Sequence, residues 1–318
     1  MAGMQAEDGR GRVVAIGEGM VELICGRDGR FDLSYGGDTL NSAVYLARCG
    51  VETAYATALG DDKHSDAMVG MMGHEGVATG LVARVPGRMP GLYMIETDET
   101  GERSFLYWRD TSPARDLFEL AQTDALCAAL AQARLVYLSG ITLSLYSARG
   151  LDRLVAALGA AREAGVEIAF DSNYRPRGWG GDVERARAAI ARVLPLARIA
   201  LPTFDDEALL WGDASPEATV ARLVGLGVQE VVVKLGGEGA LVGDAAGTRL
   251  VPIPEKVTPV DTTAAGDSFN AGYLAARLVG ETPQAAALLG HRLAAIVVQH
   301  RGAIVPRGAT SKLTATLR

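Results

Sequence analysis

Residues 261–272 read Asp-Thr-Thr-Ala-Ala-Gly-Asp-Ser-Phe-Asn-Ala-Gly, a run of small side chains that leads into a helix. Because Ala264, Ala265 and Gly266 carry almost no side chain, their backbone N–H groups can approach an anion closely, and the helix N-terminus adds positive potential. A carboxylate beside a bound polyphosphate is costly unless it accepts a proton from an attacking hydroxyl group, which is the role we expect for Asp267. The alternative is a plain strand-to-helix turn that Asp267 caps.

Residues 35–43 form a second motif, Tyr-Gly-Gly-Asp-Thr-Leu-Asn-Ser-Ala, which leads into another apolar-periodic helix. The paired glycines Gly36 and Gly37 let a ligand contact the main chain. Asp38 supplies a hydrogen-bond acceptor and Asn41 supplies both a donor and an acceptor, which suits adjacent sugar hydroxyl groups. This motif therefore predicts a sugar-binding turn.

With both motifs the chain resembles the ribokinase-like (phosphofructokinase B) family of sugar kinases, and the resemblance extends over nearly its whole length. The family signatures are a Gly-Gly-polar-x-x-Asn-x-Ala start and a terminal Asp-Thr-x-Gly-Ala-Gly-Asp. The chain departs at Ala264, where the family usually has glycine; alanine keeps its N–H group but is strained if the backbone there has a positive φ. The resemblance implies phosphoryl transfer from ATP with magnesium, with Asp267 as the base and the N–H groups of Ala264, Ala265 and Gly266 stabilising the transferring group.

Composition and charge exclude several function classes. The 318 residues are 48% apolar and carry a formal net charge of −7 without a basic run, which argues against nucleic-acid binding. The three cysteines lack Cys-x-x-Cys spacing, so we expect buried thiols in a reducing compartment. No early apolar run follows a basic start and no stretch approaches a membrane span, so we expect a cytoplasmic protein without membrane contact. Residues 1–11 are polar and glycine-rich, which predicts a disordered tail.

Short apolar runs alternate with longer helical patterns, which is typical of an α/β domain with a mainly parallel central sheet flanked by helices. Near-continuous apolar strands indicate a sheet that is buried on both faces. The expected strands are 13–16, 53–58, 135–139, 167–171, 199–202, 230–235 and 239–242. The expected helices are 43–48, 151–164, 183–194, 216–226, 267–278 and 283–299. No linker is long enough to divide the chain, so we expect one ribokinase-like kinase domain over residues 12–318.

Residues 20–35 and 89–109 break this rhythm, because polar and apolar residues alternate along them. Such alternation predicts antiparallel strands of a small sheet outside the main one. In the resembled family these strands form a lid over the sugar, and often a contact between subunits. The resemblance therefore implies a homo-oligomer assembled through the lid.

Two arginine motifs indicate the kind of sugar. Residues 107–110 read Tyr-Trp-Arg-Asp at the end of the expected lid, and residues 171–179 read Asp-Ser-Asn-Tyr-Arg-Pro-Arg-Gly-Trp after an expected strand. Arginine binds carboxylates in a forked geometry, whereas a neutral hexose offers only hydroxyl groups. The alternative is that Tyr107 and Arg109 only pack on the lid strand.

Together the two motifs look like those of 2-keto-3-deoxygluconate kinases, a branch of the family. These enzymes phosphorylate the terminal hydroxyl group of a keto-deoxy sugar acid, which implies a 6-phosphate as the product. By position, the resemblance assigns to the sugar-acid pocket Gly36, Gly37, Asp38, Asn41, Tyr93, Tyr107, Arg109, Arg175 and Asp267. The implied small-molecule partners are therefore a sugar acid and ATP.

The nucleotide side is predicted from residues 231–240, where a buried strand runs into a glycine turn. On its own such a turn is more often an ordinary hairpin. The resemblance places in the ATP site Asn173, Lys234, Gly236, Gly237, Gly239, Ala264, Ala265 and Gly266. Residues 203–207 match the place of the family's Asn-x-x-Glu motif, and Glu207 is expected to organise magnesium through water. The alternative is helix capping by Thr203 or Asp205. Adenine contacts are expected from His291, Gln299, Gly302 and Ala303.

Other function classes fit less well. Residues 17–19 follow the first strand like a dinucleotide fingerprint, but Glu22 stands where the third glycine belongs. The sequence contains no Gly-Lys pair, which argues against a Walker-type NTPase. A non-catalytic sugar-acid sensor and a neutral-sugar kinase, such as a fructokinase or ribokinase, stay open as alternatives. Asp267 argues against the former, and the paired arginine motifs argue against the latter.

Overall fold

Ten strands form one large sheet in the computed structural model, which describes residues 11–26, 28–97 and 103–315. The strand order is β14-β13-β12-β11-β10-β9-β1-β4-β5, and β6 pairs with β4. The strands are β1 Val13–Ile16, β4 Thr53–Leu59, β5 Val77–Ala78, β6 Val82–Arg84, β9 Leu135–Ser139, β10 Glu167–Asp171, β11 Ile199–Ala200, β12 Glu230–Lys234, β13 Ala240–Asp244 and β14 Gly247–Val251. Within the described sheet only two pairs, β12–β13 and β13–β14, are antiparallel. The predicted mainly parallel sheet is therefore confirmed.

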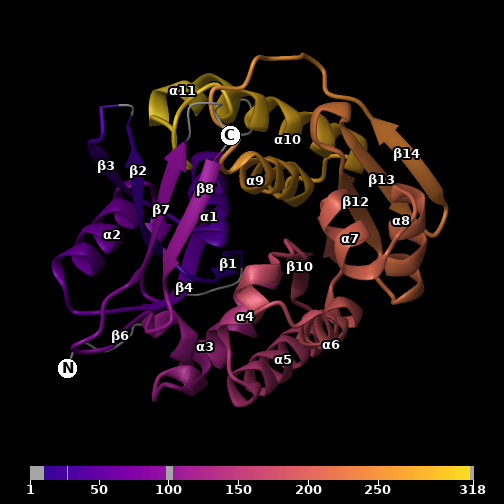
Figure 1. Ribbon diagram of the computed structural model, residues 1–318. Helices are drawn as coiled ribbons and strands as arrows, with labels where there is room; N and C mark the ends of the chain where they lie inside the picture. Colours follow the sequence, from indigo (N-terminus) through magenta and orange to yellow (C-terminus); the bar gives the residue numbers. More distant parts are fainter. Residues whose placement is uncertain (1–10, 27, 98–102, 316–318) are drawn as a thin grey trace.

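Helices cover both faces of this sheet. Successive residues of a strand point to opposite sides, so a strand that is apolar throughout needs a covering layer on each face. In β1, Val14 and Ile16 pack into one buried apolar cluster, whereas Val13 and Ala15 pack into another. The first cluster includes α3 Thr123–Leu130, α4 Gly140–Leu145, α5 Ala148–Glu163, α6 Val183–Val193, α7 Phe204–Trp211 and α8 Pro216–Gly225. The second includes α1 Asp38–Arg48, α2 Lys63–His74, α9 Ala265–Leu278, α10 Pro283–Val297 and α11 Arg307–Thr314. Figure 1 shows α9 and α10 on one side of β10, and α5 and α6 on the other.

A second sheet of four strands lies outside the large one, beside α1 (Figure 1). Its order is β3-β2-β7-β8, with β2 Met20–Cys25, β3 Phe31–Gly36, β7 Gly91–Thr97 and β8 Arg103–Trp108. The hairpins β2–β3 and β7–β8 are antiparallel as predicted, and they join through a parallel β2–β7 pair. The long crossover through α1, β4, α2, β5 and β6 lets β7 run in the same direction as β2. Polar and apolar alternation within one strand does not predict this parallel pairing. We call this sheet the lid.

The N-terminal helix α1 packs beside α9 and is held by the C-terminal part of the chain. Ser42 Oγ donates a hydrogen bond of 3.1 Å to the backbone oxygen of Asp267. The Tyr45 hydroxyl donates to the backbone oxygen of Ala303 at 2.7 Å and accepts from the backbone nitrogen of Val305 at 3.1 Å. Sequence separations of 225, 258 and 260 residues are bridged in this way. The two ends of the chain thus meet at one helix pair.

Several elements differ from the sequence prediction. The helix expected over residues 43–48 begins at Asp38, so the polar residues of the sugar motif lie on the helix itself. The strand expected over residues 199–202 ends at Ala200. The prediction lacked the short or mixed-pattern elements β5, β6, β14, α2, α3, α4, α7 and α11. The predicted tail over residues 1–11 lies outside the described residues except for Gly11, and no helix in the described ranges is long and apolar enough to cross a membrane.

Candidate functional site

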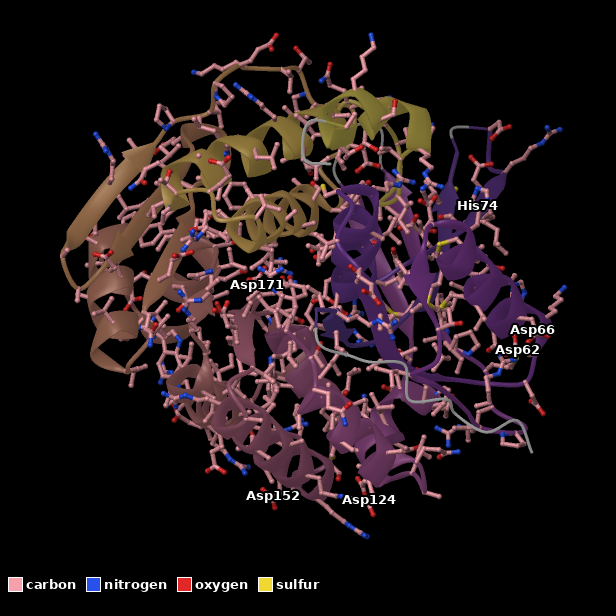
Figure 2. The ribbon with its side chains drawn as sticks, turned by 180° about the vertical axis from the view of Figure 1, so that it is seen from behind. Asp62, Asp66, His74, Asp124, Asp152 and Asp171 are labelled. Atoms are coloured by element: carbon pink, nitrogen blue, oxygen red, sulfur yellow. The ribbon has the colours of Figure 1, made fainter. Side chains whose placement is uncertain are left out.

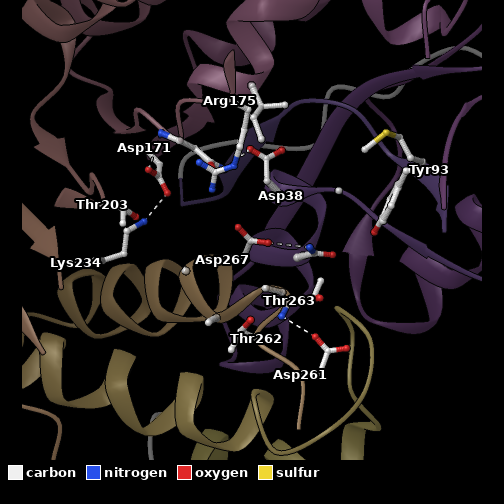
Figure 3. Close-up of a pocket in the computed structure, with 18 of the residues that line it drawn as sticks. Asp38, Tyr93, Asp171, Arg175, Thr203, Lys234, Asp261, Thr262, Thr263 and Asp267 are labelled. Atoms are coloured by element: carbon white, nitrogen blue, oxygen red, sulfur yellow. Dashed lines mark hydrogen bonds and ion pairs between the residues drawn. The ribbon is translucent and has the colours of Figure 1, made fainter. Parts of the chain in front are cut away.

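A cavity of about 770 Å³ opens where β10 and β12 end, between α1, α9 and the lid (Figure 3). The carboxyl ends of parallel strands are the usual place for ligand sites in such sheets. Its walls bring together thirteen predicted residues: Gly37, Asp38, Asn41, Tyr93, Tyr107, Arg109, Asn173, Arg175, Lys234, Ala264, Ala265, Gly266 and Asp267. The motifs from both ends of the chain therefore share one cavity.

The small-residue turn before α9 forms one wall of this cavity. The Asp261 carboxylate accepts hydrogen bonds from the backbone nitrogens of Thr263 at 2.7 Å and Gly302 at 2.9 Å, which fixes the entry to the turn. Ala264 then adopts a left-handed conformation with a φ of +59° as the N-cap of α9. This conformation costs an L-residue about 1–2 kcal/mol, and glycine avoids that cost. Ala264 therefore carries backbone strain where the resembled family usually has glycine.

Asp267 projects into the cavity from the first turn of α9. Asn41 Nδ2 donates to its Oδ2 at 2.8 Å. Figure 3 shows the carboxylates of Asp38 and Asp267 pointing into the same space. Burial raises the pKa of Asp267 to about 8, and the negative charges of Asp38 and Asp171 add to this shift, while the bond from Asn41 opposes it. A base with a pKa near the working pH is well matched to accepting a proton from an alcohol.

Asp38 is held by two side chains that follow neighbouring strands. Ser139 Oγ donates to its Oδ2 at 2.5 Å, and Asn173 Nδ2 donates to the same oxygen at 3.1 Å. Asn173 has a φ of +30°, and among the described residues only Ala264 shares a positive φ without being glycine. Both residues line the cavity, and strained backbone concentrates at functional sites. Asn173, predicted for the ATP site, thus contacts the sugar motif, and its nucleotide contact stays a prediction.

Lys234 ends β12 in a buried polar network that the sequence analysis did not predict. Its Nζ donates to Asp171 Oδ2 at 2.6 Å and to Asn270 Oδ1 at 3.2 Å. Asn270 Nδ2 donates to the same Asp171 oxygen at 2.7 Å. Figure 2 shows Asp171 in the interior, whereas Asp152 lies on the outer side of its helix. A Cβ added at Gly266 would lie 3.6 Å from Lys234 Nζ, so this ammonium group stands beside the small-residue turn.

Tyr93 is oriented by a buried carboxylate. Its hydroxyl donates to Glu22, which also accepts a hydrogen bond of 2.6 Å from Ser34 Oγ. A Cβ added at Gly36 would lie 2.8 Å from the Tyr93 hydroxyl oxygen. Gly36 therefore makes room for Tyr93 and, unlike Gly37, does not itself line the cavity. In the sequence Glu22 is notable only because it interrupts a glycine pattern, and no motif predicts that it positions Tyr93.

Positive charge gathers around Tyr107 of lid strand β8, from Arg109 after that strand and from Arg175 and Arg177 after β10. The guanidinium groups of Arg109 and Arg177 lie 5.9 Å and 5.8 Å from the centre of its ring. Partial burial raises the pKa of the Tyr107 hydroxyl, and the charges of Arg109, Arg175 and Arg177 oppose this rise. Three arginines therefore act on one phenol at the cavity wall, an arrangement suited to a bound carboxylate.

Both arginines predicted to bind a carboxylate already have acidic partners. Arg109 forms an ion pair with Glu18, and both side chains are largely buried. Arg175 Nη1 donates to Asp206 Oδ1 at 2.7 Å, and 54% of the Arg175 side chain is exposed. The sequence motifs contain the arginines, but their partners come from other segments. The lid side of the cavity is therefore less cationic than the motifs alone suggested.

Four of the predicted nucleotide and metal residues lie off the cavity wall: Glu207, Gly236, Gly237 and Gly239. The Glu207 carboxylate is buried and accepts hydrogen bonds from Ser172 and Arg222. Its predicted magnesium role, through water, stays a prediction. The preceding residue, Asp206, has a buried oxygen, Oδ2, without a hydrogen-bond partner in the described chain. Asp206 accepts a hydrogen bond from Arg175 through its other oxygen, and like Glu207 it does not line the cavity.

The residues expected at adenine have structural partners. His291 Nε2 bonds to the backbone oxygen of Val251 at 3.0 Å, and Gln299 Nε2 donates to the backbone oxygen of Ala295 at 2.8 Å. The backbone of Gly302 supports Asp261, as described above. None of these predicted residues, nor Ala303, lies on the cavity wall, and their adenine contacts stay a prediction.

Comparisons with known proteins identify the family of this chain. Residues 10–309 match the sequence profile described as pfkB family carbohydrate kinase. The 2-dehydro-3-deoxygluconokinase of Escherichia coli K12 is 44% identical over 306 residues, which cover 94% of this chain and 98% of that protein. The protein of the same name from Haemophilus influenzae is 40% identical over 308 residues, or 95% of this chain and 98% of that protein. A fructokinase from Xylella fastidiosa, solved with bound ATP, shares the fold with a TM-score of 0.80 at 21% identity, covering 97% of this chain and 98% of that chain.

Proposed function

The chain belongs to the pfkB family of carbohydrate kinases, and on this premise we propose that it transfers a phosphoryl group from ATP to the terminal hydroxyl group of 2-dehydro-3-deoxygluconate, giving the 6-phosphate. The observation that carries the proposal is the placement of Arg109 and Arg175 beside Tyr107, in the same cavity as Asp267. A neutral sugar offers these arginines no charged partner. Relatives that are 40% and 44% identical over nearly the whole chain are named for this activity.

In this proposal the sugar acid lies between the lid and α1. Gly37, Asp38 and Asn41 contact its hydroxyl groups from the N-terminal turn of α1. Tyr93 and Tyr107 cover it from the lid, and Arg109 and Arg175 receive its carboxylate through their forked N–H groups. Fixing the charged end of the sugar acid in this way directs its terminal hydroxyl group toward Asp267.

Asp267 acts as the general base. Asn41 holds one oxygen of its carboxylate at 2.8 Å, and the carboxylate removes the proton of the terminal hydroxyl group. The freed oxygen then bonds to the γ-phosphorus of ATP as the bond from that phosphorus to the leaving ADP oxygen breaks. No covalent enzyme intermediate is required. Position and charge thus account for the reaction, as is usual in phosphoryl transfer.

The opposite side of the cavity fits a polyphosphate with magnesium. The backbone N–H groups of Ala264, Ala265 and Gly266, together with Lys234, would contact the phosphates. When bound, magnesium neutralises charge on the phosphates. The described residues contain no group of three or more His, Cys, Asp or Glu that could hold a metal directly, so contact through water fits better. We assign that contact to Asp206, whose buried Oδ2 has no hydrogen-bond partner in the described chain.

The proposal includes a homo-oligomer assembled through the lid. Large apolar side chains are exposed on the lid, namely Phe31, Leu33, Leu106 and Trp108. A second copy of the lid would cover them. We expect Leu33→Asp to lower the mass measured by light scattering to that of a monomer. A wild-type chain that is monomeric at micromolar concentration would contradict this part of the proposal.

An ADP-release assay on the purified protein tests the proposed reaction. We expect kcat/KM for 2-dehydro-3-deoxygluconate to exceed that for fructose or ribose by about tenfold to a hundredfold or more, because only the acid engages the arginines. Equal or higher efficiency with fructose or ribose would favour a neutral-sugar kinase. Binding of the acid without ADP release would favour a non-catalytic sensor.

A further inference from the structure

Glu18 and Arg109 form a buried ion pair that joins the main domain to the lid. Glu18 lies in the turn between β1 and β2, and Arg109 directly follows lid strand β8. The Glu18 side chain is 1% exposed and the Arg109 side chain is 15% exposed. Arg109 lines the cavity, whereas Glu18 does not. The carboxylate therefore supports the arginine from behind the cavity wall.

The pair is joined by a direct contact between Arg109 Nη2 and Glu18 Oε2. Both carboxylate oxygens of Glu18, and Nε and Nη2 of Arg109, are buried without a hydrogen-bond partner in the described chain. Buried carboxylates normally collect hydrogen-bond donors, and a buried guanidinium group normally uses most of its five N–H groups. The ion pair uses one nitrogen of the guanidinium group, Nη2, so the remaining N–H groups of Arg109 can contact a second carboxylate.

A glycine of the lid makes room for the pair. A Cβ added at Gly91 would lie 2.6 Å from Glu18 Oε1 and 3.1 Å from the Cβ of Arg109. Any side chain at this position would therefore press on the carboxylate. Burial raises the pKa of Asp38 in the sugar motif, and the positive charge of Arg109 opposes this rise. The pair is thus built into the lid and influences the sugar site.

We propose that Glu18 sets the affinity of the cavity for carboxylates, because it holds Arg109 in position and competes for its guanidinium group. This inference rests on the proposed function, since it takes the substrate to be a sugar acid. Because Glu18 compensates the charge of Arg109, a small inorganic anion gains little by binding. A sugar acid is bound through its hydroxyl groups as well, and its carboxylate then shares the Arg109 fork with Glu18.

Glu18→Gln tests this inference because it keeps the shape of the side chain and removes its charge. We expect the KM for 2-dehydro-3-deoxygluconate to fall about threefold to tenfold, because a competing negative charge is lost next to the carboxylate site. Sulfate should inhibit the variant at a correspondingly lower concentration. Fructose, followed as a substrate or as a competing ligand, carries no charge, and its apparent affinity should change by less than about twofold.

Glu75→Gln is the matched control. Glu75 forms a buried, bidentate ion pair with Arg48 at 2.8 Å and 2.9 Å, and neither residue lines the cavity. This variant should lose stability without changing sulfate inhibition or the ratio of KM values for acid and fructose. Gly91→Ala is a second variant, because the added methyl group displaces the Glu18 carboxylate and keeps its charge. It should shift sulfate inhibition in the same direction as Glu18→Gln, by a smaller factor, and it carries the test if Glu18→Gln does not fold.

Two results would overturn the inference. One is unchanged sulfate inhibition in the folded Glu18→Gln or Gly91→Ala variant. The other is an equal change in KM for the acid and for fructose, which a purely structural role predicts. If the wild-type protein phosphorylates no sugar acid, the proposed function fails instead. Calorimetric titration of sulfate into wild type and Glu18→Gln still tests the role of Glu18 in that case.

Discussion

The lid side of the cavity collects guanidinium groups, whereas the α9 side collects carboxylates. On the lid side Arg109 and Arg175 each have an acidic partner, so their charges are compensated before any ligand arrives. On the α9 side Asp38, Asp171 and Asp267 lie close enough for the first two to raise the pKa of the third. The two sides suit the two ends of a sugar acid, because the charged end needs a cation and the reacting hydroxyl group needs a base.

The largest expected effect concerns the α9 side. Asp267→Asn should lower kcat by about two to four orders of magnitude, the usual span for loss of a general base, and should change sugar-acid affinity little. Steady-state kinetics with saturating ATP measure both quantities. Circular dichroism controls for folding. Near wild-type turnover in a folded variant would make Asp267 a structural cap. The α9 side of the cavity would then not supply the general base.

The next effect concerns the lid side. Arg109→Ala and Arg175→Ala should each raise the KM for the sugar acid about tenfold to a hundredfold, because a charge-assisted bond to a carboxylate contributes about 1.5–3 kcal/mol. The KM for ATP should change much less. Arg109→Ala should also lower stability more than Arg175→Ala does, since it leaves the buried Glu18 carboxylate unpaired. Urea unfolding of both variants measures that difference.

Lysine replacements separate the charge of the two arginines from their planar geometry. Arg109→Lys and Arg175→Lys keep the charge and lose the planar fork, so they should rescue only part of the affinity. Fructose is the control ligand, since it carries no carboxylate. Equal damage toward acid and fructose in the alanine variants would remove the reason for preferring a sugar-acid kinase.

A smaller effect follows from the pKa of Asp267. With a pKa of about 8, the base is mostly protonated at neutral pH, so kcat/KM should rise about tenfold per pH unit below pH 8 and level off above it. The folded pKa lies above that of an unfolded aspartate. The associated stability is therefore fully present below about pH 4 and is lost as pH rises through 8. Asp267→Asn should flatten that dependence, and a pH-independent kcat/KM between 6 and 8 in the wild type would contradict the shift.

The smallest effect concerns backbone strain rather than charge. Ala264→Gly relieves the left-handed conformation, which favours the folded state by about 1–2 kcal/mol, but glycine also gains about 0.4–1 kcal/mol of freedom in the unfolded chain. A net stabilisation of about 1 kcal/mol or less should appear in urea unfolding. If the variant is instead destabilised, the turn does not require a positive φ at this position.

Local patterns predicted the fold better than they predicted the site. The apolar runs of β1, β9 and β10 have the bounds expected from the sequence, because strands buried on both faces leave a continuous signal. Short or mixed elements such as β5 and α2 leave a weaker signal and were missed. The parallel pairing of β2 with β7 depends on a crossover and has no signature in either strand.

Within the site, the motifs indicated which residues gather and not what each of them contacts. Glu18 and Arg109 are far apart along the chain, so no spacing rule joins them. Asn173 was assigned to ATP from its motif, but its side chain faces Asp38. Glu207 was assigned to magnesium from its motif, and the motif did not show that its carboxylate is buried against Ser172 and Arg222.

The pairing of α1 with α9 also fixes when the site can exist during biosynthesis. The hydrogen bond from Asn41 to Asp267 spans 226 residues. At a synthesis rate of roughly 5–20 residues per second, a nascent helix α1 waits about 10–45 s for the residues that complete it. During that interval its apolar face, which includes Leu40 and Val44, has no α9 to cover it and is available to chaperones. A chain whose synthesis ends before Asp267 therefore contains the sugar motif but lacks the base, even if its N-terminal half is folded.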